Sequence, residues 1–115
     1  MAVKIGFIGA GKMAEALIGG LIAKNIFSKD EIAACAPSQG TRDHISGTYG
    51  VATFGTAKEV VDVADKLVLA VKPKHVPGLF LDEKVEIGTG KMLISIVAGL
   101  PIKKLKSYVP DAKIV

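Results

Sequence analysis

The fold of this chain is decided by the stretch Val3-Lys4-Ile5-Gly6-Phe7-Ile8-Gly9-Ala10-Gly11-Lys12-Met13-Ala14. An apolar run, typical of a buried strand, ends in the pattern G-x-G-x-x-A, and a helical pattern begins at once. Gly9 permits a tight turn, Gly11 lets the backbone approach a phosphate, and Ala14 lets the helix pack closely on the strand. The stretch therefore predicts a strand, turn and helix N-terminus that hold the pyrophosphate of a dinucleotide. The predicted contacts are Gly9, Ala10, Gly11, Lys12, Met13 and Ala14.

A second pattern overlaps the first. Residues 6–12 also read G-x-x-x-x-G-K, the opening of a nucleoside-triphosphate loop. That loop requires Ser or Thr next, to bind magnesium, and this chain has Met13. Gly6 would also lie inside the strand, so we reject this interpretation. An ordinary glycine-rich turn is the remaining alternative, which the strand before it and the helix after it disfavour.

Composition and charge limit the classes of function. The chain has 115 residues, enough for one domain, and half of them are apolar with few aromatics, as in α/β proteins. The net charge of +4 is mild, and no basic patch interleaved with aromatic residues predicts a nucleic-acid partner. The lysines at 103, 104 and 106 are expected on the solvated face of a short helix.

The sequence also bears on compartment and metals. No apolar run approaches the roughly 18–20 residues that span a membrane, and the first residues lack the pattern of a secretory signal. The single cysteine, Cys35, cannot form an internal disulfide, which fits a reducing, cytoplasmic location. Its apolar surroundings predict a buried, inert thiol. No cluster of His, Cys and carboxylate residues predicts a metal site.

Strand-like and helix-like segments alternate along the chain. We expect strands at 3–8, 31–36, 51–53, 66–71, 92–97 and 113–115, and helices at 12–24, 39–49, 56–64, 75–81 and 101–108. One broad apolar helix face is expected from two rows of residues four apart, Met13, Leu17 and Leu21 and Ala14, Ile18 and Ile22. The continuous apolar runs 66–71 and 92–97 predict strands that are covered on both faces. The alternation predicts an α/β fold with a doubly wound, mainly parallel sheet of the Rossmann type, with residues 1–115 forming a dinucleotide-binding domain.

The end of the second strand bears on which dinucleotide is bound. Domains limited to NAD usually carry Asp or Glu here for the ribose 2′-hydroxyl, and residues 36–42 contain neither. They offer Ser38, Thr41 and Arg42, a combination of hydroxyls and a cation that suits a 2′-phosphate. We therefore favour NADP, with NAD possible. A plain solvent loop with Arg42 facing water is the alternative.

Two further segments carry a resemblance to a known family. Ala70-Val71-Lys72-Pro73 follows one predicted strand, and Ser95-Ile96-Val97-Ala98-Gly99 spans the end of another. Together with the first turn, in this order and spacing, they resemble pyrroline-5-carboxylate reductase. The resemblance implies that both segments lie against the cofactor near its nicotinamide half, and that Ser38 and Arg42 lie beside the 2′-phosphate. The implied contacts are Ala70, Val71, Lys72, Pro73, Val97, Ala98 and Gly99.

The same resemblance implies a function. Family members reduce 1-pyrroline-5-carboxylate to L-proline with NAD(P)H, the last step of proline biosynthesis. In the family, a strand like residues 113–115 continues into R-x-M-P-N-T-P and a helical C-terminal domain, which forms the homo-oligomer and most of the substrate site. That domain is absent from this chain, so we expect cofactor binding without turnover and assign no catalytic residue. Neither His44 nor His75 has a paired Asp or Cys at motif spacing, so neither is assigned a catalytic role. His75 is expected at the surface at the start of a helix, with a position near the cofactor as the alternative. The alternative function is a non-catalytic dinucleotide-binding or redox-sensing module.

Overall fold

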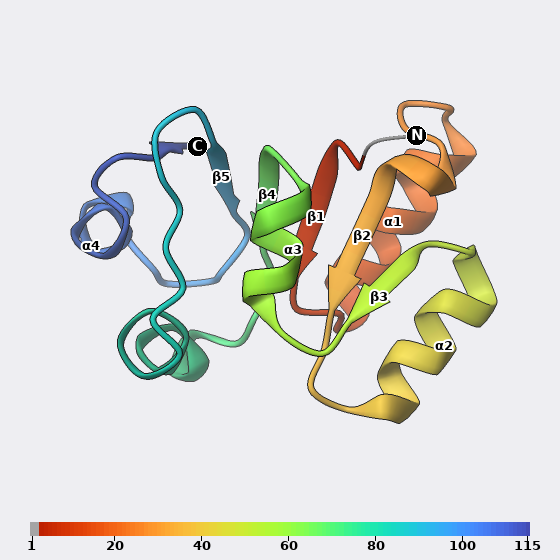
Figure 1. The fold of residues 1–115 in the computed structure, drawn as a ribbon, viewed down its shortest axis with the longest axis horizontal. Helices are drawn as coiled ribbons and strands as arrows, with labels where there is room; N and C mark the ends of the chain where they lie inside the picture. The colour runs from red at the N-terminus through yellow and green to blue at the C-terminus, as the bar shows by residue number, and fades with distance from the viewer. Residues whose placement is uncertain (1–2) are drawn as a thin grey trace.

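The computed structural model describes residues 3–115 and contains a six-stranded sheet whose neighbouring strands are all parallel (Figure 1). The strands are β1 (Ile5–Ile8), β2 (Ile32–Cys35), β3 (Ala52–Phe54), β4 (Lys66–Leu69), β5 (Met92–Ser95) and β6 (Lys113–Ile114). Their order across the sheet is β3-β2-β1-β4-β5-β6. This order, with helical connections between the strands, confirms the predicted doubly wound α/β fold.

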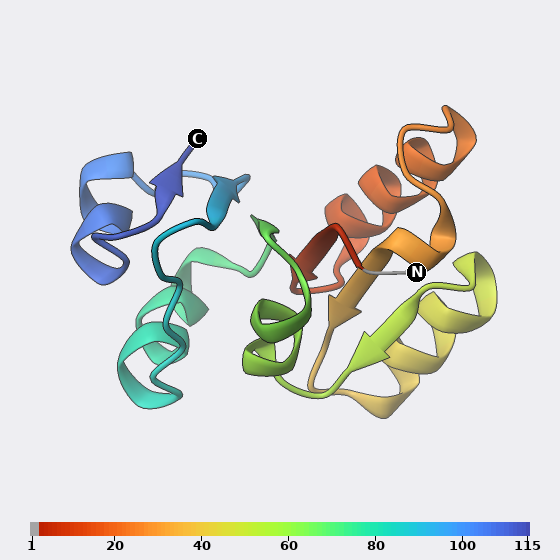
Figure 2. The same ribbon diagram turned by 45° about the horizontal axis from the view of Figure 1, so that its top comes forward.

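Helices cover the two faces of the sheet in separate groups (Figures 1 and 2). The connections contain α1 (Lys12–Ala23), α2 (Gln39–Tyr49), α3 (Ala57–Val63), α4 (Ile102–Tyr108), the 3₁₀ turns η1 (Lys29–Glu31) and η2 (Pro73–His75), and the π-helical turn η3 (Gly78–Asp82). Ile18 of α1 and Ile45 of α2 are buried in one core cluster. Val60 of α3, Leu79 of η3 and Leu105 of α4 belong to the other. Within residues 3–115, no helix combines the length and the apolarity needed to cross a membrane.

The first helix packs through a narrower stripe than its sequence predicts. Ala14 and Ile18 are almost fully buried against the sheet. Met13 and Leu17, expected on the same face, have exposed fractions of 63% and 40%. Residues four apart form one row along a helix, so the row that contains Ala14 and Ile18 faces the sheet while the adjacent row turns outward. The prediction of one broad apolar face was therefore wrong at Met13 and Leu17.

The segment after β4 differs most from expectation. A helix was predicted at 75–81, and the structure has η2 followed by η3 instead. Val76 and Pro77, which join the two turns, both keep right-handed helical backbone, but Pro77 has no N–H to donate, so the hydrogen-bond pattern is interrupted there. The other predicted helices and strands are present, and their ends differ from the structure by no more than two residues.

The two strands predicted to be covered on both faces differ from each other. In β4, Leu67, Val68 and Leu69 are all buried, as predicted. In β5 only Leu93 is buried, and Met92 and Ile94 remain half-exposed. The reason is that α1 and α2 pack near β1–β3, whereas η3 and α4, which follow β4 and β5, lie on the opposite face. The prediction of a fully covered strand at 92–97 was therefore wrong.

The sheet order brings three turns to one edge. In the parallel register, Ile8 pairs with Cys35 of β2 on one side and with Leu69 of β4 on the other. All three strands therefore end level with one another, and the segments that leave them begin side by side. Because the chain continues from β1 to β2 but the sheet continues from β1 to β4, this edge is the topological switch point, where doubly wound folds bind ligands.

Candidate dinucleotide-binding site

The turn after β1 has the geometry that its glycine pattern predicts. Gly9 has a φ of +107°, which side chains rarely adopt, and a Cβ there would lie 2.9 Å from the carbonyl carbon and oxygen of Ala70. Gly11 is the N-cap of α1 and has an extended backbone. A Cβ on Gly11 would meet no atom within 4 Å. Gly9 is thus required by the fold, whereas Gly11 leaves open the space in front of the helix that an anion would enter.

The rest of this turn presents its backbone and one cation. Ala14 is 1% exposed, so its small side chain allows α1 to lie close to the sheet. Ala10 is half-buried, and Lys12 and Met13 are exposed in the first turn of α1. N–H groups of the first helical turn have no acceptor within the helix, and the helix dipole makes this end partly positive. Together with Lys12 they form an arrangement suited to a pyrophosphate.

The loop between β2 and α2 presents a hydroxyl group at a helix N-terminus. Ser38 is the N-cap of α2, and its Oγ accepts a hydrogen bond from the Thr41 N–H at 3.4 Å. Ser38 is exposed and Thr41 is half-buried. The segment carries no carboxylate between residues 36 and 42. The chemistry expected for a ribose 2′-phosphate is therefore present at the end of β2.

Arg42 occupies this loop in a way that sequence reasoning missed. Its guanidinium donates hydrogen bonds to the carbonyl oxygens of Ala36 at 2.6 Å and Pro37 at 3.0 Å, and to Oε1 of Gln39 at 2.8 Å. The side chain is half-buried rather than turned freely to water. Arg42 thus holds the loop in shape and keeps a positive charge beside it.

The segment after β4 closes over the phosphate turn. The N–H of Ala70 donates to the carbonyl of Ile8 at 2.9 Å, which extends the β1–β4 pairing by one bond. Val71 is half-buried, while Lys72 and Pro73 are exposed at the start of η2. Ala70 and Val71 are therefore in direct contact with the turn at Gly9, and Lys72 extends into solvent beside it.

The third predicted segment lies farther along the same edge. Val97 is buried, and its N–H donates to Oγ of Ser95 at 3.3 Å. Ala98 and Gly99 are exposed, and Gly99 has a φ of +73°. Because β5 lies beyond β4, these residues are on the opposite side of the phosphate turn from Ser38. An extended dinucleotide with its pyrophosphate at Gly11 would therefore have one half over β2 and the other over β4 and β5.

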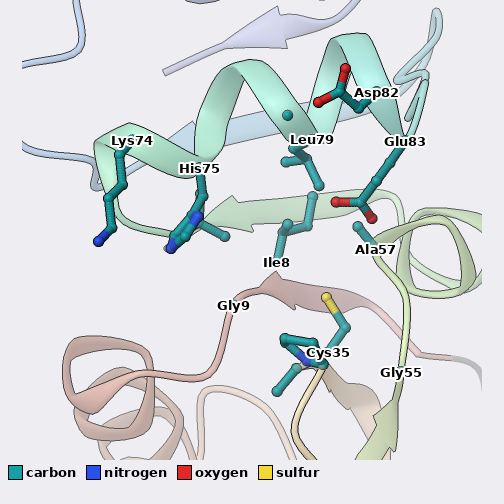
Figure 3. Close-up of a pocket in the computed structure, with 14 residues that line it drawn as sticks. Ile8, Gly9, Cys35, Gly55, Ala57, Lys74, His75, Leu79, Asp82 and Glu83 are labelled. Atoms are coloured by element: carbon teal, nitrogen blue, oxygen red, sulfur yellow. The ribbon is translucent and has the colours of Figure 1, made fainter.

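A cavity of about 370 Å³ opens between the ends of β1 and β2 and the η2–η3 segment (Figure 3). Of the residues predicted to contact the cofactor, only Gly9 and Val71 line this cavity. The other lining residues are Ile8, Cys35, Ala36, Pro37, Gly55, Ala57, Lys74, His75, Gly78, Leu79, Asp82 and Glu83. His75, which was expected at the surface, is exposed at the rim of this cavity. Lys74, His75, Asp82 and Glu83 could have been found as charged or titratable side chains that follow a site strand, whereas the apolar lining residues carry no such signal.

Electrostatic contacts join the first turn of α1, beside the phosphate turn, to helix α2. The Glu15 carboxylate in the first turn of α1 lies 2.8 Å from Nε2 of His44 and accepts a hydrogen bond from the Tyr49 hydroxyl at 3.0 Å. These two hydrogen bonds lower the pKa of Glu15 below its ordinary value of 4.5. At the cavity, burial raises the pKa of the Cys35 thiol above its ordinary value, and the thiol is buried as expected. His44 is exposed and paired with Glu15.

Strand order, phosphate turn and edge cavity together define a nucleotide-binding domain of the Rossmann type. The family model described as "NADP oxidoreductase coenzyme F420-dependent" matches residues 4–99, and the chain belongs to this family.

Individual relatives agree with the resemblance expected from the sequence. Over 105 residues, the chain is 33% identical to the pyrroline-5-carboxylate reductase of Arabidopsis thaliana, covering 91% of this chain and 38% of that protein. The structure of a pyrroline-5-carboxylate reductase from Coxiella burnetii superposes with a TM-score of 0.87 at 27% identity, covering 99% of this chain and 43% of that one. The structure of the Plasmodium falciparum pyrroline carboxylate reductase with NADP bound superposes with a TM-score of 0.80 at 30% identity, covering 97% of this chain and 40% of that one. The chain thus spans less than half the length of these relatives.

Proposed function

We propose that this chain is the NADP(H)-binding part of an oxidoreductase that reduces 1-pyrroline-5-carboxylate to L-proline. The observation that carries the proposal is the intact phosphate turn. Gly9 adopts the positive φ of that turn, and the space beside Gly11 is open. The likeness to pyrroline-5-carboxylate reductases along nearly the whole chain gives the reaction class. NADPH, when bound, supplies the hydride, and the chain's own residues bind and orient it.

The proposed cofactor contacts follow the edge of the sheet. The pyrophosphate is held by residues 9–14, and the 2′-phosphate by Ser38 and the charge of Arg42. The nicotinamide half is flanked by residues 70–73 and 97–99. The Plasmodium falciparum relative binds NADP, and residues 36–42 of this chain contain no carboxylate that would oppose a 2′-phosphate. NADP is therefore the proposed cofactor, with NAD as the weaker ligand.

A titration and an assay test the proposal. We expect calorimetry to show NADPH binding to the 115-residue chain, and we expect no proline formation from pyrroline-5-carboxylate at saturating NADPH. The reason is that the chain spans less than half of its catalytic relatives, which implies that the substrate site requires further residues. Absence of NADPH binding would refute the cofactor site. Robust turnover by this chain alone would refute the inference that the substrate site requires further residues.

The substitution Ser38→Asp tests the choice of cofactor. Asp is as good an N-cap as Ser, so α2 keeps its cap while the loop gains a negative charge. A charge-assisted hydrogen bond contributes about 1.5–3 kcal/mol, so NADPH affinity should fall about ten- to a hundredfold, and NADH gains an acceptor for its 2′-hydroxyl. Ser38→Ala is the matched control, which removes the hydroxyl without adding charge. An unchanged NADPH-to-NADH affinity ratio in Ser38→Asp would show that this loop does not contact the ribose.

A further inference from the structure

The cavity beside the phosphate turn has two ends of opposite charge. Lys74 and His75 lie at one end of the η2–η3 segment, on the side of Gly9, and Asp82 and Glu83 lie at the other end (Figure 3). The middle of the cavity is apolar: Ile8 from β1, Cys35 from β2 and Leu79 from η3 line it, and each is less than 10% exposed. A ligand with an anionic end, a flat apolar body and a hydrogen-bond donor at its far end would match this arrangement.

The adenosine half of a dinucleotide has these three properties. With the pyrophosphate beside Gly11, the half of the molecule that extends over β2 reaches the cavity through Ala36 and Pro37, which are lining residues. The cavity volume of about 370 Å³ lies within the range of roughly 300–1,000 Å³ of small-molecule sites. An adenine ring presents an apolar face and an exocyclic amino group, which donates hydrogen bonds to acceptors.

Of the two acidic residues, Glu83 is the one positioned to accept such a bond. Its side chain points into the cavity toward Ala57 and Cys35, whereas the Asp82 side chain lies on the outer side of η3 (Figure 3). Glu83 and Cys35 both line the cavity, and the negative charge of Glu83 adds to burial in raising the pKa of the Cys35 thiol. Among residues 3–115, no hydrogen bond or ion pair to the Glu83 carboxylate is present, so its acceptor capacity is available to a ligand.

The proposed position of NADPH places the adenine base in this cavity. We propose that the Glu83 carboxylate accepts a hydrogen bond from the exocyclic amino group of that base, so that this chain discriminates adenine from hypoxanthine. The inference rests on the proposed function, because it takes the bound molecule to be NADPH. It adds a specificity-determining residue to that site. Hypoxanthine has a carbonyl oxygen where adenine has the amino group, and two acceptors facing each other repel.

The test compares NADPH with reduced nicotinamide hypoxanthine dinucleotide phosphate by calorimetry on the 115-residue chain. We expect the chain to bind NADPH about ten- to a hundredfold more tightly, the range that one hydrogen bond to a charged group gives. In Glu83→Gln the ratio should fall toward one, because a neutral amide can both donate and accept. Asp82→Asn is the matched control, since it removes the same charge from the adjacent residue and should leave the ratio unchanged.

The outcomes separate the two proposals. Equal affinity of the parent chain for both dinucleotides, or an unchanged ratio in Glu83→Gln, would overturn the role of Glu83 and leave NADPH binding intact. Equal reductions in Glu83→Gln and Asp82→Asn would also overturn it, because a general charge effect would then suffice. Failure of the parent chain to bind either dinucleotide would overturn the proposed function and this inference together. Both residues are exposed, so we expect both variants to fold, and far-UV circular dichroism checks this.

Discussion

Gly9 and Gly11 of the phosphate turn should respond differently to the same substitution, because the two glycines have different physical roles. In Gly9→Ala, the new side chain must adopt a φ of +107° and would lie 2.9 Å from the backbone of Ala70. Strained backbone of this kind costs about 1–3 kcal/mol, and overpacking against atoms that cannot move aside costs about 1–3 kcal/mol more. We therefore expect Gly9→Ala to lose about 2–6 kcal/mol of the free energy of unfolding, a large share of the roughly 5–15 kcal/mol typical of a domain.

Gly11→Ala is the control within the same turn. No atom lies within 4 Å of the added Cβ, and the backbone is extended, so the substitution causes no clash or strain. Alanine is a poorer N-cap than glycine, but it also restricts the unfolded chain, and these opposing effects leave a change of about 1 kcal/mol or less. Gly11→Ala should instead weaken NADPH binding, and Gly11→Val should weaken it further, because the side chain enters the proposed phosphate space.

The assay is urea denaturation followed by far-UV circular dichroism, since the chain has no tryptophan for fluorescence. In thermal unfolding, the loss in Gly9→Ala corresponds to a decrease in Tm of roughly 4 °C for each kcal/mol. NADPH affinity is measured by calorimetry on each variant that remains folded. The reasoning is refuted if Gly9→Ala unfolds at the same urea concentration as the parent chain, or if Gly11→Ala is destabilised as much as Gly9→Ala.

Three further predictions concern named contacts. The hydrogen bonds that lower the pKa of Glu15 stabilise the fold above its ordinary pKa of 4.5 and lose their effect as the pH falls through the lowered value. In urea denaturation at several pH values, Glu15→Gln should therefore be less stable than the parent chain at neutral pH and should converge with it well below pH 4.5; a constant difference would contradict this. Lys91 donates from Nζ to the carbonyl oxygens of Val61 at 2.8 Å and Ala64 at 2.9 Å at the end of α3, so Lys91→Met should lose about 1–3 kcal/mol of stability. The exposed pair Lys58–Asp62 supplies the control, because Lys58→Met should change stability by less than about 1 kcal/mol, and equal losses would disprove the capping role. Because burial raises the pKa of Cys35, iodoacetamide should alkylate it far more slowly than free cysteine at neutral pH, and mass spectrometry should show still slower labelling with NADPH bound. A labelling rate that NADPH does not change would place the bound dinucleotide outside the cavity.

Local patterns were sufficient to predict the class of fold and the phosphate turn. The G-x-G-x-x-A turn, the alternation of strands and helices, and the absence of a carboxylate at 36–42 each depend on residues close together in the chain. A turn of this kind requires glycine at Gly9 whatever surrounds it, because the backbone there has a positive φ. The helix at 39–49 was predicted at the bounds that the structure has. The structure shows that Ser38 caps one end and that Gly50 ends the other in a left-handed conformation, and both are local features.

The tertiary structure decided whatever depends on residues far apart in the sequence. Periodicity alone could not show that Met13 and Leu17 turn outward, because exposure depends on which row of α1 meets the sheet. From its charge, Arg42 was predicted to lie beside the 2′-phosphate. Its hydrogen bonds to the carbonyl oxygens of the β2–α2 loop could not be predicted, because they depend on how that loop folds back. The cavity could not be predicted at all. It forms because parallel pairing ends β1 and β2 at one edge, and because the η2–η3 segment that follows β4 places Glu83 opposite Cys35.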